Sequence, residues 1–462
     1  MTQVRYVSEP STYLVQAPGD DGDSAGAAQL LLGARLHVDP DGVQQGFLPA
    51  RTVPDAEGNS RQGFVEAART SLTQQLKVFY FDVGQGDACL VEAEGAVVIV
   101  DGGPNSGFVD LLEERLAGLR RAEVDLGNPP PARLRVDAVV VTHFDVDHYR
   151  GLISLLEHPE FEFGRVYHNG LPRYADGAGK DLDLGDVVNH QDGTRSISTD
   201  LRGLDTARAL LASGDLLTAA GNDNVCAQFL RAAVEAADAQ RLDALEMLVR
   251  RDPAGAAPVL PDLGPDLQFE VLGPLTTETE GSVRLRAFPD PHDVTQTNPN
   301  PAPSESHTVN GNSIVLRLRY GQRQFLFGGD LNQPAQAYLR ERYGAGVFEA
   351  DVNKACHHGS SDFAIEFLED VAPMATVFSS GDSGSYDHPL PDAIGAAARH
   401  SRGRFPLVFS TELAREVGKE VLLGHINARS NGDVIVMAQK KEKPSVRKTW
   451  HAFALPFAGP FG

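Results

Sequence analysis

The amino-acid sequence predicts an α/β fold that carries a small β-rich N-terminal domain and a helical insert. Three strand-like runs open the main part of the chain between residues 76 and 100, and helix-like and strand-like segments alternate after them. This alternation is typical of sheets layered with helices rather than of a helical bundle. Residues 171–265 interrupt it, because Leu204–Ser213 and Val225–Arg251 repeat their apolar residues with the period of a helix.

The N-terminal region, residues 1–74, has a pattern of its own. Apolar segments such as Leu30–Val38 are separated by turn signals such as Asp39-Pro40-Asp41-Gly42. Short strands between such turns predict a small β-barrel. The pattern "LLLGARLHV … GFLPART … RQGFV" loosely resembles bacterial SH3-like domains, and an irregular β-rich arm is the alternative interpretation.

Residues 75–440 are predicted to form one domain around the insert, and residues 441–462 a C-terminal tail. Within the domain, Ser313–Phe327 reads as a β-hairpin, and Asn332–Tyr343 has the pattern of a helix with a proline in its first turn. Near its end, Asn431-Gly432 is a strong hairpin signal.

Composition describes an ordinary globular protein of 462 residues, 42% hydrophobic and 23% charged. No apolar run approaches the ~20 residues of a membrane span, so we expect no membrane partner. The first residues, Met1–Tyr6, lack the apolar core of a signal peptide, which predicts a cytoplasmic protein. The chain has three cysteines and no CxxC spacing, which suits a reducing compartment.

The net charge of −22 argues against a protein that coats nucleic acid, because the surface as a whole would repel phosphate. A nuclease is still compatible with this charge. Bound cations and a local basic patch can override the net charge at a single site.

Four residues that can bind a metal fall within six positions after the mostly apolar run Val136–Val141. They are His143, Asp145, Asp147 and His148. Carboxylates and imidazoles crowded in this way compete for protons unless a divalent cation neutralises them. Positions i and i+2 of an extended loop face the same way, so His143 and Asp145 can share one ion. The alternative interpretation is a solvated acidic loop with two incidental histidines.

Five motifs in order resemble the metallo-β-lactamase superfamily, and more specifically the hydrolase domain of ComEC-like competence proteins and its stand-alone soluble relatives. They are "FDVGQGDACLVE…VVIVDGG", "THFDVDHYRGL", "NGNSIVLRLRYGQRQFLFGGDL", "KACHHGSSD" and "SSGDSGSYDHP". The resemblance covers about residues 75–440 apart from the insert. It implies a sandwich of two β-sheets flanked by helices, with metals at the sheet edges.

The resemblance also implies roles for residues beyond the first ligand motif. Asp330 matches a bridging carboxylate, and His357 or His358 matches a later ligand histidine. His388 is expected to be either a further ligand or a phosphate contact. Asp101 would orient the first motif through hydrogen bonds without binding the metal itself. Lys354 precedes the histidine pair, where it either offsets charge on a phosphate or is a solvated lysine.

Two departures from the superfamily bear on the metal. Asp145 replaces the second histidine of the commoner His-x-His-x-Asp-His motif, although this change is usual in the ComEC-like branch. Leu272-Gly273-Pro274 offers no histidine where lactamases carry one. One or two divalent ions are expected, and because carboxylates favour harder ions, we hypothesise that Mn²⁺ competes with Zn²⁺.

The expected chemistry is metal-assisted hydrolysis. A metal lowers the pKa of bound water, and the resulting hydroxide attacks phosphorus or a carbonyl carbon. Asp147 is expected to orient this nucleophile, and His388 or Lys354 to assist the leaving group.

The first hypothesis for the substrate is a phosphodiester in nucleic acid or a nucleotide. The second is a small ester, lactone or amide. The third is a hydrolase module that acts only within a multi-protein assembly, with the N-terminal domain or the helical insert binding the partner protein.

Overall fold

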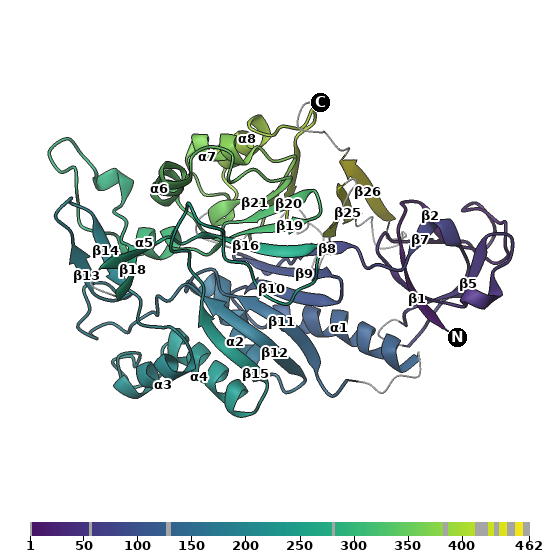
Figure 1. Cartoon of the computed structure of the whole chain (residues 1–462), viewed down its shortest axis with the longest axis horizontal. Helices are drawn as coiled ribbons and strands as arrows, with labels where there is room; N and C mark the ends of the chain where they lie inside the picture. The colour runs from purple at the N-terminus through teal and green to yellow at the C-terminus, as the bar shows by residue number, and fades with distance from the viewer. Residues whose placement is uncertain are drawn as a thin grey trace.

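The computed structural model describes residues 2–54, 58–125, 131–279, 282–381, 387–411, 424–428, 434–440 and 449–455. Two large mixed β-sheets lie face to face at the centre of the molecule, and helices cover both outer faces (Figure 1). The predicted α/β layering is therefore confirmed.

The first large sheet has nine strands in the order β15-β12-β11-β10-β9-β8-β24-β25-β26. Strands β10, β11, β12 and β15 run parallel to one another, and the remaining pairs are antiparallel. The strands are β8 (Leu76–Tyr80), β9 (Ala88–Ala93), β10 (Ala96–Gly102), β11 (Leu134–Val140), β12 (Phe161–His168), β15 (Leu242–Met247), β24 (Gly424–Ala428), β25 (Val434–Lys440) and β26 (Thr449–Leu455).

The second large sheet has six strands in the order β16-β19-β20-β21-β22-β23. Its first three strands pair antiparallel, including the predicted hairpin β19–β20, and β20 to β23 run parallel. The strands are β16 (Leu267–Gly273), β19 (Val315–Tyr320), β20 (Arg323–Phe327), β21 (Val352–Lys354), β22 (Ala375–Phe378) and β23 (Leu407–Ser410).

Alternating side chains of each strand form separate apolar layers. In β10, Val98 and Val100 pack between the two sheets, whereas Ile99 points to the helices on the outer face. In β20, Phe325 and Phe327 face the other sheet, and Leu326 packs under helices of the opposite face. Both sheets are thus buried on two faces, which explains their nearly continuous apolar runs.

Helices α1 to α4 cover the nine-stranded sheet, and α6 and α7 cover the six-stranded one. The predicted helix over 332–343 is confirmed as α6, with Asn332 as its N-cap and a proline in its first turn. The helices are α1 (Gly107–Asp125), α2 (Val146–Glu157), α3 (Leu204–Ser213), α4 (Val225–Asp238), α5 (Glu305–Gly311), α6 (Gln333–Tyr343), α7 (Ile365–Val371) and α8 (Pro391–Arg399).

The predicted helix over Val225–Arg251 is wrong in its second half. Helix α4 ends at Asp238, Gln240 takes a left-handed φ of 56°, and β15 follows as a parallel edge strand beside β12. Leucines at 242, 245 and 248 fit a helical period, but a short apolar run does not distinguish a helix from a strand.

The region 171–265 also contributes β13 (Val187–Asn189) and β14 (Arg195–Ser198). These strands pair in a four-stranded sheet with β17 (Thr276–Thr279) and β18 (Ser282–Arg286).

The N-terminal region forms a five-stranded antiparallel sheet in the order β6-β5-β4-β1-β7, with a separate β2–β3 pair. Its assignment as an SH3-like domain stays a prediction. The strands are β1 (Gln3–Val7), β2 (Thr12–Leu14), β3 (Ala28–Leu30), β4 (Arg35–Val38), β5 (Phe47–Thr52), β6 (Gln62–Glu66) and β7 (Thr70–Ser71).

Strand β26 lies within residues 441–462 and pairs with β25 at the edge of the nine-stranded sheet, and the division of the chain into domains stays a prediction. The Asn431-Gly432 turn signal lies outside the described residues, although β24 and β25 on either side of it pair antiparallel. Within the described ranges, no helix combines the length and apolar character needed to cross a membrane.

The packing of α2 leads to a first prediction, because a Cβ atom on Gly151 would clash with the carbonyl oxygens of Gly102 and Asn105. We expect Gly151→Ala to lower the free energy of unfolding by about 1–3 kcal/mol, as overpacking of a core does. The urea midpoint measures this loss.

Gly118→Ala is the matched control, since Gly118 also lies within a helix and a Cβ atom added to it would meet nothing within 4 Å. It should stabilise the protein by about 0.5–1 kcal/mol. Equal midpoints for the two variants would contradict the packing described here.

Candidate metal centre

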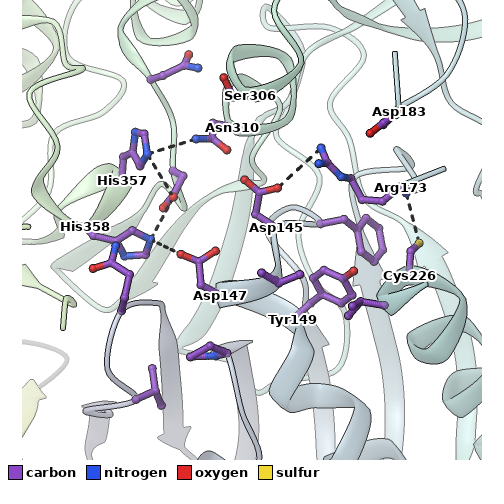
Figure 2. Close-up of a pocket in the computed structure, with 18 of the residues that line it drawn as sticks. Asp145, Asp147, Tyr149, Arg173, Asp183, Cys226, Ser306, Asn310, His357 and His358 are labelled. Carbon is purple, nitrogen blue, oxygen red and sulfur yellow. Dashed lines mark hydrogen bonds and ion pairs between the residues drawn. The ribbon is translucent and has the colours of Figure 1, made fainter. Parts of the chain in front are cut away.

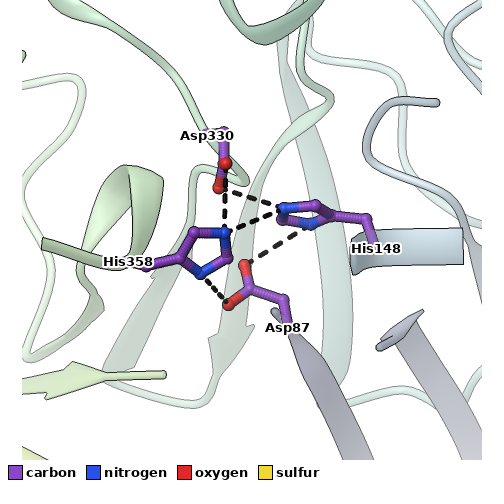
Figure 3. Close-up of side chains that lie close together, drawn as sticks. All are labelled: Asp87, His148, Asp330 and His358. Atoms are coloured by element: carbon purple, nitrogen blue, oxygen red, sulfur yellow. Dashed lines mark hydrogen bonds and ion pairs between the residues drawn. The ribbon is translucent and has the colours of Figure 1, made fainter. Parts of the chain in front are cut away.

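The candidate site lies where the carboxyl ends of parallel strands from both sheets meet. His143 follows β11, and His148 lies in the first turn of α2, for which Asp145 is the N-cap. Asp330 follows β20, and His358 follows β21 in a short 3₁₀ turn. Residues more than 200 positions apart therefore meet at one point (Figure 3).

Two histidine nitrogens face each other across the centre of the cluster. The Nε2 atoms of His148 and His358 are 3.2 Å apart. Asp330 lies against both of them, with Oδ1 3.2 Å from Nε2 of His148 and Oδ2 3.1 Å from Nε2 of His358 (Figure 3). All three side chains are buried.

The other nitrogen of each imidazole is already engaged by the protein. Nδ1 of His148 is 3.0 Å from Asp101, and Nδ1 of His358 is 2.9 Å from the carbonyl oxygen of Ser379. A carbonyl oxygen and a carboxylate only accept hydrogen bonds, so both Nδ1 atoms donate. In the neutral rings each Nε2 therefore carries a bare lone pair. Two lone pairs and a carboxylate aimed at one another repel unless a cation lies among them, so these residues fit a divalent metal.

His143 presents a third bare nitrogen. Its Nδ1 is 3.1 Å from Oγ1 of Thr142 and 3.3 Å from Oγ of Ser313. Both hydroxyls already donate elsewhere, Thr142 to Asp101 and Ser313 to the carbonyl of Asn310, so they accept from His143. Its Nε2 is buried and has no hydrogen-bond partner among the described residues.

Asp101 is hydrogen-bonded to two residues of the first motif and its flank, Thr142 and His148. Its carboxylate accepts from the Thr142 backbone at 2.8 Å, from Oγ1 of Thr142 at 2.7 Å and from His148 at 3.0 Å. Asp101 has a left-handed φ of 59°, a conformation that is uncommon for residues other than glycine. His357 and His358 share it, with φ of 50° and 54°. Such strain often collects at functional sites.

The charges of the cluster depend on one another. Burial alone would lower the pKa of His148, but the Asp330 and Asp101 carboxylates outweigh burial and hold this pKa well above its usual range. The pKa of His358 is raised in the same way by Asp330 and Asp87. Burial would raise the pKa of Asp330, but the histidines hold it well below its usual range. The carboxylates thus stabilise positive charge at the histidines, and either protons or a metal ion can supply that charge.

The two aspartates of the first motif lie on different sides of the histidines. Asp147 Oδ2 is 3.4 Å from Nε2 of His358, whereas Asp145 Oδ2 is 3.9 Å from Nε2 of His143. The other oxygen of Asp145 lies 3.9 Å from Nη1 of Arg173. Burial raises the pKa of Asp145 to about 6 even though the Arg173 guanidinium opposes this shift.

Asp87 is a buried carboxylate whose role the sequence did not reveal. It is close enough to His148, Asp330 and His358 to be counted with them as a possible ligand. Its oxygens, however, lie 3.3 Å from Nδ1 of His358 and 3.7 Å from Nδ1 of His148, on the side away from the bare nitrogens. We therefore place Asp87 behind the ligands.

Lys354 forms a buried ion pair with Asp87 and also lies 3.1 Å from the carbonyl oxygen of Gly329. Its ammonium neutralises Asp87 beneath the histidines, and Lys354 is absent from the described residues that line the cavity above them. Of the two interpretations that the sequence left open, the solvated lysine is wrong because Lys354 is buried, and a role toward a phosphate stays a prediction.

A cavity of about 970 Å³ opens above the cluster. Asp145, Asp147, Asp330 and His358 line it, and Figure 2 shows Asp145 and Asp147 between His357 and His358 on one side and Arg173 on the other. This volume lies within the range of ligand pockets, at the upper end. The centre is therefore accessible to a small substrate.

His357 and His388 form one wall of this cavity. Their rings are 5.8 Å apart, and Nε2 of His357 is 3.4 Å from Asn310. Nδ1 of His388 is 3.4 Å from the Gln85 side chain, and burial lowers the pKa of His388 to about 4. A neutral His388 can donate a hydrogen bond to a group in the cavity.

Comparison with known proteins agrees with this geometry. Residues 81–172, which contain Asp87, Asp101 and the first ligand motif, match the Metallo-beta-lactamase superfamily. The segment that carries the first ligand motif is therefore similar to the metallo-β-lactamase superfamily, and this similarity together with the cluster supports an enzyme with metal-dependent hydrolase chemistry.

Two curated relatives match part of the chain. The chain is 28% identical over 103 residues to ComE operon protein 3 of Bacillus subtilis (strain 168), which is 22% of this chain and 13% of that protein. It is 37% identical over 90 residues to competence protein ComA of Neisseria gonorrhoeae, 19% of this chain and 13% of that protein. The chain thus spans only about an eighth of the length of these relatives.

Solved structures give only a distant likeness. The β-hydroxylase CmlA from Streptomyces venezuelae is 13% identical with a TM-score of 0.33, over 79% of this chain and 56% of that one. A diphosphatase of the PhnP family is 11% identical with a TM-score of 0.29, over 73% and 95%. The metallo hydrolase Igni18 from Ignicoccus hospitalis KIN4/I is 12% identical with a TM-score of 0.29, over 75% and 98%. TM-scores this low carry no conclusion about this chain.

The hydrogen bond between Asp101 and His148 leads us to expect that a conservative substitution of Asp101 weakens metal binding. Asp101→Asn keeps the shape but removes the carboxylate that fixes the His148 ring, so the affinity for a divalent ion should fall about 10- to 100-fold. Calorimetric titration of the metal-free protein with Zn²⁺ or Mn²⁺ measures this loss.

Asp243→Asn serves as the control, because this aspartate lies on the surface and pairs only with Arg135 in the contacts described. It should leave the metal affinity unchanged. An Asp101→Asn protein that binds metal as tightly as the wild type would show that Asp101 does not orient His148.

Proposed function

We propose that the protein is a metal-dependent phosphodiesterase that acts on nucleic acid or nucleotides. The observation that carries this proposal is the convergence of bare histidine nitrogens and Asp330 at the floor of an open cavity. The partial likeness to competence proteins, over 103 and 90 residues, is the reason that we place a phosphodiester before a small ester, lactone or amide.

His148, His358, Asp330 and Asp147 would hold a divalent ion, and His143 with Asp145 would hold a second ion if one binds. A bound divalent ion supplies Lewis acidity and lowers the pKa of a water molecule toward neutrality. The remaining residues act on the substrate through hydrogen bonds. Asp147 lies at the cavity floor, where its carboxylate can orient an attacking water.

The wall residues suit the leaving group and the anionic oxygens of a phosphodiester. His388 is neutral at pH 7, and the Gln85 amide beside its Nδ1 favours the tautomer with hydrogen on Nε2. We therefore propose that Nε2–H of His388 donates a hydrogen bond to the leaving oxygen. The Asn310 side chain, on the same wall beside His357, can donate to a nonbridging oxygen.

The proposed partners of the protein rest on sequence patterns alone. We propose that the N-terminal five-stranded sheet is SH3-like, and that it or the helical part of residues 171–265 binds a partner protein. A cytoplasmic location is likewise proposed. Co-purification of one stable partner would support the binding proposal, and loss of that partner when residues 2–71 are replaced would assign the binding to the N-terminal sheet.

Removal of Asp147 should abolish hydrolysis without unfolding the protein. We expect Asp147→Ala to lower kcat on bis-p-nitrophenyl phosphate and on single-stranded DNA by about 100-fold or more. Its thermal midpoint should stay close to that of the wild type, because the side chain is partly exposed to the cavity. Steady-state kinetics and thermal denaturation measure the two effects.

Asp205→Ala is the control, because Asp205 is fully exposed on α3. Wild-type activity on p-nitrophenyl esters combined with none on DNA, RNA, cyclic nucleotides or bis-p-nitrophenyl phosphate would contradict the proposed substrate class. Undiminished turnover by Asp147→Ala would contradict the role of this residue.

The oxygen ligands lead to a prediction about the metal. Asp330, Asp147 and Asp145 give the site a large share of carboxylate oxygens, so Mn²⁺ should compete with Zn²⁺. Metal analysis of protein purified without added metal should find manganese, or Mn²⁺ should raise the activity of the metal-free protein. Stoichiometric zinc together with no activation by Mn²⁺ would refute this hypothesis.

A further inference from the structure

Arg173 lies at the end of the cavity opposite the histidine wall. Figure 2 shows its side chain on the far side of Asp145 and Asp147 from His357 and His358. Among the described residues that line the cavity, Arg173 is the only lysine or arginine, and it stands against five aspartates. Its guanidinium is therefore the one permanent positive charge that these lining residues supply.

Three contacts hold Arg173 in position. Nη2 of its guanidinium lies 2.8 Å from Glu305, at the start of α5. Its backbone carbonyl accepts a hydrogen bond of 2.8 Å from Asn224, and its backbone N–H donates to the sulfur of Cys226 at 3.4 Å. A group fixed in this way loses little conformational freedom when a ligand binds to it.

The other arm of the guanidinium lacks an acceptor. Nη1 is buried and has no hydrogen-bond partner among the described residues. Oδ1 of Asp145 is 3.9 Å from Nη1, which is too long for a hydrogen bond. A buried donor without an acceptor costs free energy, so the guanidinium has hydrogen-bonding capacity that its protein neighbours do not use.

We propose that Arg173 forms a second anion subsite, which binds a phosphate of the substrate other than the phosphate that is hydrolysed. This inference rests on the proposed function and restricts the proposed substrates to those with more than one phosphate. The scissile phosphate would lie at the cluster of His148, His358 and Asp330, and a neighbouring phosphate of the same strand or nucleotide would accept from the guanidinium of Arg173, whose side chain is 26% exposed and lines the cavity.

The charge of the cavity explains why this subsite would select its ligand. Asp145 and Asp183 line the same end, and they would repel an anion that found no fixed cation there. A guanidinium binds phosphate through directed hydrogen bonds, so it favours a ligand with a phosphate at this position over one with a neutral group. The substrate class is therefore a nucleotide or strand with at least two phosphates.

Two ligands that lack a phosphodiester separate binding at the subsite from hydrolysis. We would measure the Kd of thymidine 5′-monophosphate and of thymidine 3′,5′-bisphosphate by calorimetry on metal-loaded protein. The wild type should bind the bisphosphate about tenfold more tightly or better, as expected for a charge-assisted hydrogen bond. Arg173→Met should bind both ligands equally, and Arg173→Lys should retain part of the preference.

Arg150→Met is the matched control, because Arg150 is exposed on α2 and lies outside the cavity lining. It should keep the preference of the wild type, and Arg173→Met should keep the wild-type metal content and thermal midpoint. Three results would overturn the subsite: a wild type without the preference, a preference that survives in Arg173→Met, or a loss of metal in that variant.

The proposed function can fail independently of the subsite. An Arg173-dependent preference for the bisphosphate, in a protein that cleaves no phosphodiester, would support the subsite and contradict the phosphodiesterase. Hydrolysis of phosphodiesters with no dependence of ligand affinity on Arg173 would support the phosphodiesterase and contradict the subsite.

Discussion

The candidate centre depends on one constraint, which is that the protein satisfies Nδ1 of three buried histidines and leaves their Nε2 atoms bare. Asp101 accepts from His148, the Ser379 carbonyl accepts from His358, and two hydroxyls accept from His143. A neutral imidazole with its Nδ1 protonated offers only Nε2 to a metal. The orientation of each ring is thus fixed before an ion binds, and Asp330 places its carboxylate oxygens against Nε2 of His148 and of His358.

The fold produces this constraint by bringing strand ends together. The second acceptor of the cluster, Ser379, lies just after β22, while Asp101 lies at the end of β10 in the other sheet. Close approach of backbone segments is essential here, because a side chain at Gly86 would clash with the carbonyl of Asp147, and one at Gly329 would press on Thr142 and Ser313. The sandwich therefore fixes the spacing of ligands that come from opposite ends of the chain.

The sequence predicted the residues with strong metal chemistry, but it missed much of what holds them. His143, Asp147, His148 and Asp330 fall in a dense motif or a recognisable match, so residue type alone marks them. Ser313 and Ser379 have no such signal, since one acts through a hydroxyl and the other through its backbone carbonyl. Asp87 lies within a matched motif, yet only the structure places it behind the histidines, paired with Lys354.

Secondary structure was predicted well where a helix-start signal marks the element, as the proline in the first turn does for α6, and poorly where a short apolar run fits two periods. Leu242–Met247 is such a run, and its pairing with β12 made it a strand. Likewise, β26 joins the sheet through pairing with β25, which local sequence does not encode. Tertiary pairing decided both elements.

The most direct test of the bare-nitrogen constraint is anomalous diffraction from crystals grown with Mn²⁺ or Zn²⁺. An anomalous peak between Nε2 of His148 and Nε2 of His358, within bonding distance of Asp330, is the predicted result. A peak bound through Nδ1 of either ring, or no peak at this point with metal present elsewhere in the protein, would contradict the account.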